Sequence, residues 1–119
     1  SVNQSVVVNN TAGSIVGYKY FNLDSLDRSR KLDLVLRLKP LGVEGTVTVM
    51  MDSPWEVNGG VKLGTFQLKA NAPQVATDVR TDVSALRGYG DKHAIYLVFS
   101  SPTENRSLCD LMELEFQSR

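Results

Sequence analysis

Hydrophobic residues alternate with polar ones along most of this chain. Residues 31–39 (KLDLVLRLK) place four leucines on one side of an extended segment and mostly charged residues on the other. Residues 46–51 (TVTVMM) repeat the pattern, with Val47, Val49 and Met51 on one face. A period of two is typical of strands that bury one face. The pattern therefore predicts β-strands that pack on a common core.

Further segments with the same character extend this prediction to the rest of the chain. They are residues 5–8, 14–23, 61–69, 74–81, 93–100 and 108–116, with short separators rich in Gly, Asn, Pro or Ser. Residues 82–88 (DVSALRG) form the one helix-like stretch, and it is too short for more than one turn. About eight strands at this spacing predict an all-β fold, a two-sheet antiparallel β-sandwich of the jelly-roll type. We expect residues 1–119 to form a single β-sandwich module, the C-terminal piece of a longer enzyme.

The net charge argues against some classes of binding partner, and the cysteine content excludes some kinds of covalent and metal site. The chain has 13 basic and 13 acidic residues, and its net charge is therefore zero. Nucleic acid and acidic membrane surfaces attract a basic excess, so neither is an expected partner. No apolar run approaches the roughly 20 residues that cross a bilayer, so no membrane insertion is expected. Cys109 is the only cysteine, which excludes an internal disulfide and a cysteine-based metal cluster.

Candidate catalytic groups are few. His93 is the only histidine, and its spacing from Ile95 and Leu97 places it on the inward face at the start of a strand. We interpret it as a histidine that forms hydrogen bonds at the end of a sheet. Asp110 has the same parity as Leu114, so we expect it to point inward and to cap a strand or accept a backbone hydrogen bond. A metal site needs three or four ligands. The sequence therefore predicts a non-catalytic chain without metal or cofactor.

Aromatic rings in loops are the remaining candidates, because sugar-binding modules stack flat rings on pyranose faces. Trp55 lies in MDSPWEVNGG (residues 51–60), between turn-forming residues on both sides. It could be a platform for a sugar, a plug that closes one end of the core, or a surface that docks on a neighbouring domain. The last two interpretations are favoured. Tyr89, between two glycines, is expected to be exposed, and Asn105 lies in a polar loop.

Four stretches in this order resemble the family 6 carbohydrate-binding modules, especially the divergent versions attached to glycoside hydrolases, for example those of family 43. They are GSIVGYKYFNL, GTVTVMMDSPWEVNGGVKLGTFQL, GDKHAIYLVFS and LCDLMELEF, which together span residues 13–116. The resemblance implies a jelly-roll sandwich that binds plant or microbial polysaccharide beside a hydrolase. It also implies a secreted, periplasmic or cell-surface location in bacteria.

The chain departs from the family where the resemblance implies ligands. The family's cleft holds a sugar between two aromatic rings, but the matching positions hold Ile15 and, in the later segment, Val75 and Ala76. The family's ligand amide falls around Asp110, with Asn105 close by. The family often binds a structural calcium ion through acidic residues in its first and last strands. Here the first strand carries no acid and Met112 occupies the matching late position, so no calcium is predicted there.

These observations predict a non-catalytic accessory module of a secreted glycoside hydrolase that binds a neutral plant-type polysaccharide weakly or through an altered site. The alternative is a module that braces the catalytic domain and binds no sugar. The predicted ligand-binding residues are Trp55, Tyr89, Asn105 and Asp110. A groove formed by Trp55, Tyr89 and Asn105 would favour glycan binding, whereas a flat apolar face around Trp55 would favour docking.

Overall fold

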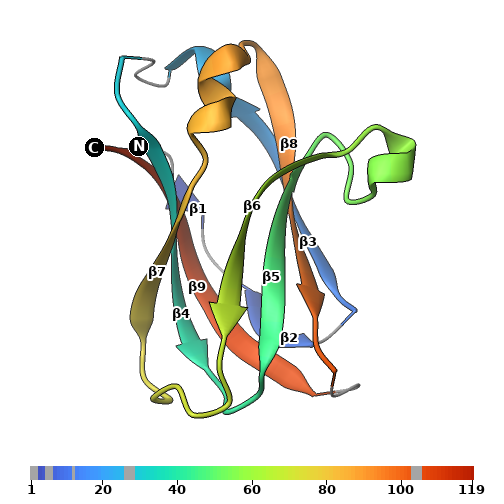
Figure 1. Cartoon of the computed structure of the whole chain (residues 1–119), viewed down its shortest axis with the longest axis vertical. Coiled ribbons are helices and arrows are strands. Elements are labelled where there is room, and N and C mark those ends of the chain that lie inside the picture. The colour runs from blue at the N-terminus through green and yellow to red at the C-terminus, as the bar shows by residue number, and fades with distance from the viewer. Residues whose placement is uncertain (1–2, 5–6, 12, 26–28, 103–105) are drawn as a thin grey trace.

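The computed structural model describes residues 3–4, 7–11, 13–25, 29–102 and 106–119. Within these ranges the chain forms strands joined by loops and short 3-10 turns (Figure 1). The strands are β1 (Asn3–Gln4), β2 (Val7–Thr11), β3 (Ile15–Asn22), β4 (Leu32–Pro40), β5 (Gly45–Met51), β6 (Val61–Leu68), β7 (Thr77–Asp82), β8 (Lys92–Ser100) and β9 (Ser107–Ser118). The 3-10 turns are η1 (Leu23–Ser25), η2 (Glu56–Asn58) and η3 (Ser84–Gly88).

The strands form two antiparallel sheets (Figure 1). Sheet A has the order β1-β9-β4-β7, and β2 pairs with β9 further along the edge that β1 occupies. Sheet B has the order β3-β8-β5-β6. From β2 to β9 the chain passes to the other sheet at every connection except the β5–β6 hairpin, as in a jelly roll. The predicted two-sheet antiparallel β-sandwich is confirmed.

The core lies between the two sheets and follows the predicted alternation on the central strands. Val47, Val49 and Met51 of β5 are fully buried, as the sequence predicts. Each large side chain removed from water in this way stabilises the fold by about 1.5–3 kcal/mol before its entropy cost. The side chains that β4, β8 and β9 contribute at no more than 1% exposure are Leu32, Leu34, Leu36, Leu38, Ile95, Leu97, Phe99, Leu108, Cys109, Leu111, Leu114 and Phe116.

A bulge in β3 changes which rings enter the core. The register between β3 and β8 shifts between Tyr18 and Phe21. Strict alternation would place these two rings on opposite faces of the sheet. Because the bulge adds a residue, Tyr18 and Phe21 are both buried, and Tyr20 between them is 65% exposed.

A second bulge lies in β9. Arg37 of β4 pairs with Glu113 and the next residue, Leu38, pairs with Leu111, which leaves Met112 as an extra residue. Alternation continued back from Leu114 predicts an inward Asp110, and this prediction is wrong. The bulge reverses the alternation, so Leu111 is fully buried while Asp110 is half-buried opposite Lys39.

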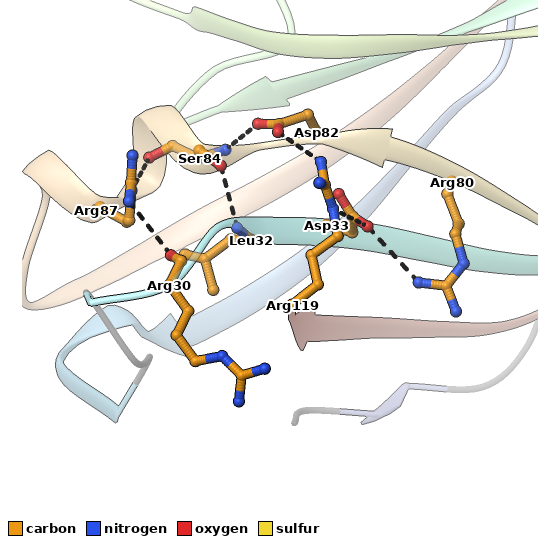
Figure 2. A network of polar contacts seen from close by, with 8 residues as sticks. All are labelled: Arg30, Leu32, Asp33, Arg80, Asp82, Ser84, Arg87 and Arg119. Atoms are coloured by element: carbon orange, nitrogen blue, oxygen red, sulfur yellow. Dashed lines mark hydrogen bonds and ion pairs between the residues drawn. The ribbon is translucent and has the colours of Figure 1, made fainter.

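A polar network joins the starts and ends of three strands of sheet A (Figure 2). The carboxylate of Asp33, on β4, is only 6% exposed and accepts a hydrogen bond from Arg119 Nε at 2.7 Å. It also lies 3.6 Å from the guanidinium group of Arg80 on β7. Arg119 reaches Asp82, at the end of β7, with an N–O distance of 2.8 Å. These ion pairs hold β9 and β7 to the start of β4.

The same network fixes η3 (Figure 2). Asp82 accepts a hydrogen bond from the backbone N–H of Ser84 at 2.7 Å, and Ser84 Oγ accepts one from the N–H of Leu32 at 3.0 Å. The Ser84 N–H and hydroxyl, followed by the charge of Arg119, hold the pKa of Asp82 below its ordinary value. The helix-like turn predicted from the sequence is therefore confirmed as η3, with Leu86 fully buried beneath it.

Candidate ligand-binding surfaces

Residues 52–60 connect β5 to β6 and carry Trp55; we call this segment the Trp55 loop. Figure 1 shows its 3-10 turn, η2, standing out from one end of the sandwich. The carbonyl of Trp55 accepts hydrogen bonds from the N–H groups of Asn58 at 3.1 Å and Gly60 at 3.0 Å. Gly59 has a φ of 89°, which favours glycine. A Cβ on Gly60 would meet the Trp55 carbonyl oxygen at 2.8 Å. The loop is therefore a compact turn that its own backbone bonds hold together.

Trp55 lines an open hollow of about 290 Å³ on the outer face of sheet B. The residues that line this hollow, which we call the Trp55 hollow, are Thr48, Met50, Pro54, Trp55, Glu56 and Val98. Trp55 is 48% exposed, so the interpretation of this ring as a plug over the core is wrong. Met50 points outward from β5 but is only 4% exposed. The hollow offers one flat ring, apolar side chains, one hydroxyl and one carboxylate.

The outer face of sheet B continues the apolar surface beside this hollow. Val98 pairs with Ile15 of β3, which is 38% exposed. The ring of Tyr96 packs over Gly17, because a Cβ on that glycine would meet the ring at 3.0 Å. Ile15 and Val98 therefore extend an apolar strip from the hollow toward the β3 edge of the sheet.

The outer face of sheet A carries a different surface. A shallow groove of about 310 Å³, the sheet A groove, is lined by Val35, Arg37, Asp78, Glu113, Glu115 and Gln117. Arg37 and Asp78 form an exposed ion pair at 3.2 Å. Gln117 donates a hydrogen bond to Glu115 at 3.0 Å. These groups can form hydrogen bonds with hydroxyls, but no aromatic ring lines this groove.

The other residues predicted to bind ligand do not join Trp55. Tyr89 is half-buried against the core, with its ring edge-on to His93 at 6.0 Å, so its predicted exposure is wrong. It does not line the Trp55 hollow. Asp110 pairs with Lys39 near the end of β4, at the opposite end of the sandwich from the Trp55 loop (Figure 1). Asn105 lies outside the described residues.

His93 forms hydrogen bonds at the start of β8, as predicted. Its Nδ1 lies 2.7 Å from Oδ1 of Asp52, and its Nε2 lies 2.9 Å from the carbonyl oxygen of Gly90. The hydrogen bond to Asp52 is the main cause that raises the pKa of His93 above its ordinary value, and burial opposes it. Both ring nitrogens are thus engaged, which leaves neither available as a general base. The sequence alone could not identify Asp52 as a partner, since this contact depends on the pairing of β5 with β8.

The described residues do not fit a metal site. In this part of the chain, no three His, Cys, Asp or Glu side chains lie close enough to hold an ion. Met112 occupies the position in β9 where the resemblance implies a calcium ligand, and a thioether is a poor ligand for calcium. Within the same ranges, no helix has the length and apolar character that crossing a membrane requires.

Comparisons with known proteins bear on the fold. No family model matches the sequence, and no curated protein matches it. A similar solved structure is a glycoside hydrolase family 43 arabinoxylan arabinofuranohydrolase from Bacillus subtilis, in complex with cellotetraose. Its TM-score is 0.72 at 18% identity, over 96% of this chain and 21% of that one, so this chain spans about a fifth of the hydrolase.

A second similar structure is a family 6 carbohydrate-binding module whose binding sub-sites were dissected. Its TM-score is 0.66 at 19% identity, over 100% of this chain and 88% of that one. Identities this low establish the fold, and they agree with the resemblance drawn from the sequence. This chain has the β-sandwich fold of a family 6 carbohydrate-binding module.

Proposed function

We propose that this chain is a non-catalytic accessory module that binds a neutral polysaccharide, with Trp55 as the ring on which a sugar stacks. The observation that carries the proposal is the half-exposed indole in an open hollow of about 290 Å³. That volume lies near the lower end of the roughly 300–1,000 Å³ typical of ligand pockets. The shared fold with a carbohydrate-binding module supports the same class of ligand.

The chemistry of the hollow suits a pyranose. The flat indole of Trp55 presents a negative π-face to the C–H groups on one side of a sugar ring. Thr48 and Glu56 at the rim offer a hydroxyl and a carboxylate to the sugar's own hydroxyls. The hollow is open, so a polymer can pass across it without its ends entering a pocket.

Binding through this surface is expected to be weak. Stacking on one ring contributes only on the order of 1–3 kcal/mol, by analogy with the stacking of nucleic-acid bases on aromatic side chains. The positions that correspond to the family's two stacking rings hold Ile15 and Val75, so a second ring does not reinforce Trp55 there. We therefore expect dissociation constants on the order of 1 mM rather than 1 μM.

The longer protein in this proposal is a secreted, periplasmic or cell-surface glycoside hydrolase. Support comes from the similar arabinofuranohydrolase, of which this fold makes up about a fifth. A weakly binding module on such an enzyme would raise the local concentration of its polysaccharide, because the two sites then act on one chain.

Affinity electrophoresis in gels that contain xylan, β-glucan or arabinan tests the proposal. The wild-type chain should be retarded by at least one polysaccharide relative to its own mobility in a plain gel. Trp55→Ala should abolish the retardation. Val57→Ala is the matched control, because Val57 lies in the same turn, is 91% exposed and does not line the hollow.

A variant of the sheet A groove locates the ligand. Glu113→Gln removes a charge from that groove and leaves the Trp55 hollow intact. It should be retarded like the wild type. Loss of retardation in Glu113→Gln but not in Trp55→Ala would place the glycan on sheet A and overturn the role of Trp55. Absence of retardation by every polysaccharide would overturn glycan binding itself.

A second candidate function is docking on the catalytic domain of the same chain. The observation that favours it is the apolar strip of Ile15 and Val98 beside the Trp55 hollow, with Val57 almost fully exposed at the loop. Exposed apolar patches of this kind often mark contact surfaces. Trp55→Leu separates the two functions: it keeps apolar bulk for docking and removes the flat ring that stacking needs. If the module only docks, no polysaccharide should retard it in gels. In the full-length protein, Trp55→Leu should then leave the stability unchanged, whereas Trp55→Asp should lower it.

A further inference from the structure

One histidine connects the Trp55 loop to the segment before β8. Asp52 is the first residue of the loop, and its carboxylate lies 2.7 Å from Nδ1 of His93. The other ring nitrogen, Nε2, lies 2.9 Å from the carbonyl oxygen of Gly90. A single imidazole ring therefore bridges the end of β5 and the turn that follows η3.

Both partners of this imidazole can only accept hydrogen bonds. A carbonyl oxygen has no proton to donate, and an ionised carboxylate has none either. Both contacts are hydrogen bonds only when His93 carries protons on Nδ1 and Nε2. A neutral ring must direct a lone pair at either Asp52 or Gly90, so one contact becomes repulsive.

We infer that protonated His93 is a positioning residue that holds the Trp55 loop in the orientation that forms the hollow, so that glycan affinity falls as the pH rises through the titration of this histidine. The inference rests on the proposed function, since it concerns the regulation of the same site.

The backbone conformation of Asp52 explains why loss of its hydrogen bond to His93 can move the Trp55 loop. Its φ is 72°, a left-handed conformation that is uncommon for residues other than glycine. Two bonds hold it there: its N–H donates to the carbonyl of Ala94 at 2.9 Å, and its carboxylate bonds to His93. Loss of the second bond removes one of these two restraints. Trp55 follows only three residues later, so a small change in direction at Asp52 displaces the ring.

The carboxylates of Asp52 and Asp91 near the imidazole favour its protonated form. Asp52 faces it from the end of β5, and Tyr89 and Asp91 face it from the segment before β8. From η1, Asp24 accepts a hydrogen bond from the N–H of Asp91 at 3.1 Å. Phe21, the partner on β3, carries no charge.

The direction of the pH effect follows from these surroundings. The pKa of His93 is raised above its ordinary value of 6.5, chiefly by the hydrogen bond to Asp52. A group whose pKa is higher in the folded state than in the unfolded state stabilises the fold fully at a pH below its unfolded-state pKa. This stabilisation is lost as the pH rises through its folded-state pKa. The bridge is therefore intact in mildly acidic solution and weakened in alkaline solution.

The composition of the chain makes this inference directly measurable. It has one histidine and one tryptophan, so each gives an unambiguous signal. The chemical shift of the His93 Hε1 proton and the emission of Trp55 would be followed from about pH 5 to pH 9. We expect both to change in one transition with a common midpoint above 6.5. Asp52→Asn should lower the midpoint, whereas Asp78→Asn on the opposite sheet should leave it unchanged.

Gel retardation at the two ends of this pH range completes the test. Wild-type retardation should weaken several-fold from acidic to alkaline pH. A Trp55 emission that stays constant while His93 titrates would overturn the inference, and this measurement needs only the wild-type chain. Absence of retardation at every pH, with the Trp55 transition intact, would instead contradict the proposed function and the affinity claim that depends on it.

Discussion

Burial controls the chemistry of the one cysteine in the chain. Cys109, on β9, is fully buried in the core. Burial, with a smaller contribution from the neighbouring charge of Asp110, raises the pKa of its thiol to about 12. The reactive form of cysteine is the thiolate, so the folded chain holds this group as an inert thiol at neutral pH.

A thiol reagent should therefore report unfolding. We predict that Ellman's reagent modifies Cys109 in the native chain only as fast as the sandwich opens, and modifies it at once in denaturant. The time course of the absorbance change at neutral pH measures this. Rapid and complete modification of the native chain would show that this end of β9 is open to solvent.

The position of His93 could be predicted from the sequence, but its partners could not. Alternation with Ile95 and Leu97 places it correctly, because a strand has only two faces. Its bond to Asp52 depends on how two distant strands pair. For Tyr89 the predicted position itself is wrong. Its flanking glycines indicate exposure, whereas the turn of η3 directs its ring onto the core.

Strand ends in sheet A are held together by the buried carboxylate of Asp33. Its two cationic neighbours come from different parts of the sheet, Arg119 directly after β9 and Arg80 from β7 (Figure 2). A buried charge is costly unless it is paired, so this carboxylate depends on both neighbours. Arg37 and Asp78, in contrast, form a pair with both side chains about half exposed.

Asp33→Asn should lower the free energy of unfolding by about 1–3 kcal/mol, because a charged acceptor is lost from a buried position. Asp78→Asn makes the same chemical change in the exposed pair and should cost only about 0–1 kcal/mol. Urea unfolding of both variants measures the difference. Equal losses would contradict the structural role of the Asp33 network.

The bulges in β3 and β9 mark the limit of prediction for individual strands. The predicted strands from residue 14 onward are present, and of the predicted strand 5–8 only Val7 and Val8 lie within the described residues, in β2. A single inserted residue, however, reverses which face every later side chain occupies. This is why Tyr18 and Phe21 both enter the core, and why Asp110 does not point inward with Leu114.

The two outer faces of the sandwich differ in character. Sheet A presents charged and amide side chains, whereas sheet B presents Met50, Val98 and Ile15 beside the Trp55 loop. The alternation in the sequence indicates that Met50 and Val98 point outward. It does not indicate that β5 and β8 are neighbours, and this pairing is what builds the hollow.

The sequence lacks aromatic rings at the two positions where the resemblance to the family implies them. Ile15 and Val75 are 38% and 60% exposed, and stand where the resemblance places stacking rings. An aliphatic side chain cannot provide the flat π-face that a sugar ring needs. Trp55, which is half exposed and lines an open hollow, is therefore the ring that we propose for stacking.

Titration of Trp55 emission with soluble oligosaccharides of xylan, β-glucan and arabinan tests the central claim most directly. The signal arises from the ring that is proposed to touch the ligand, because the chain has no other tryptophan. We predict a saturable change in emission with the oligosaccharide whose polymer retards the chain in gels. An unchanged emission at concentrations that saturate binding would show that the sugar lies elsewhere.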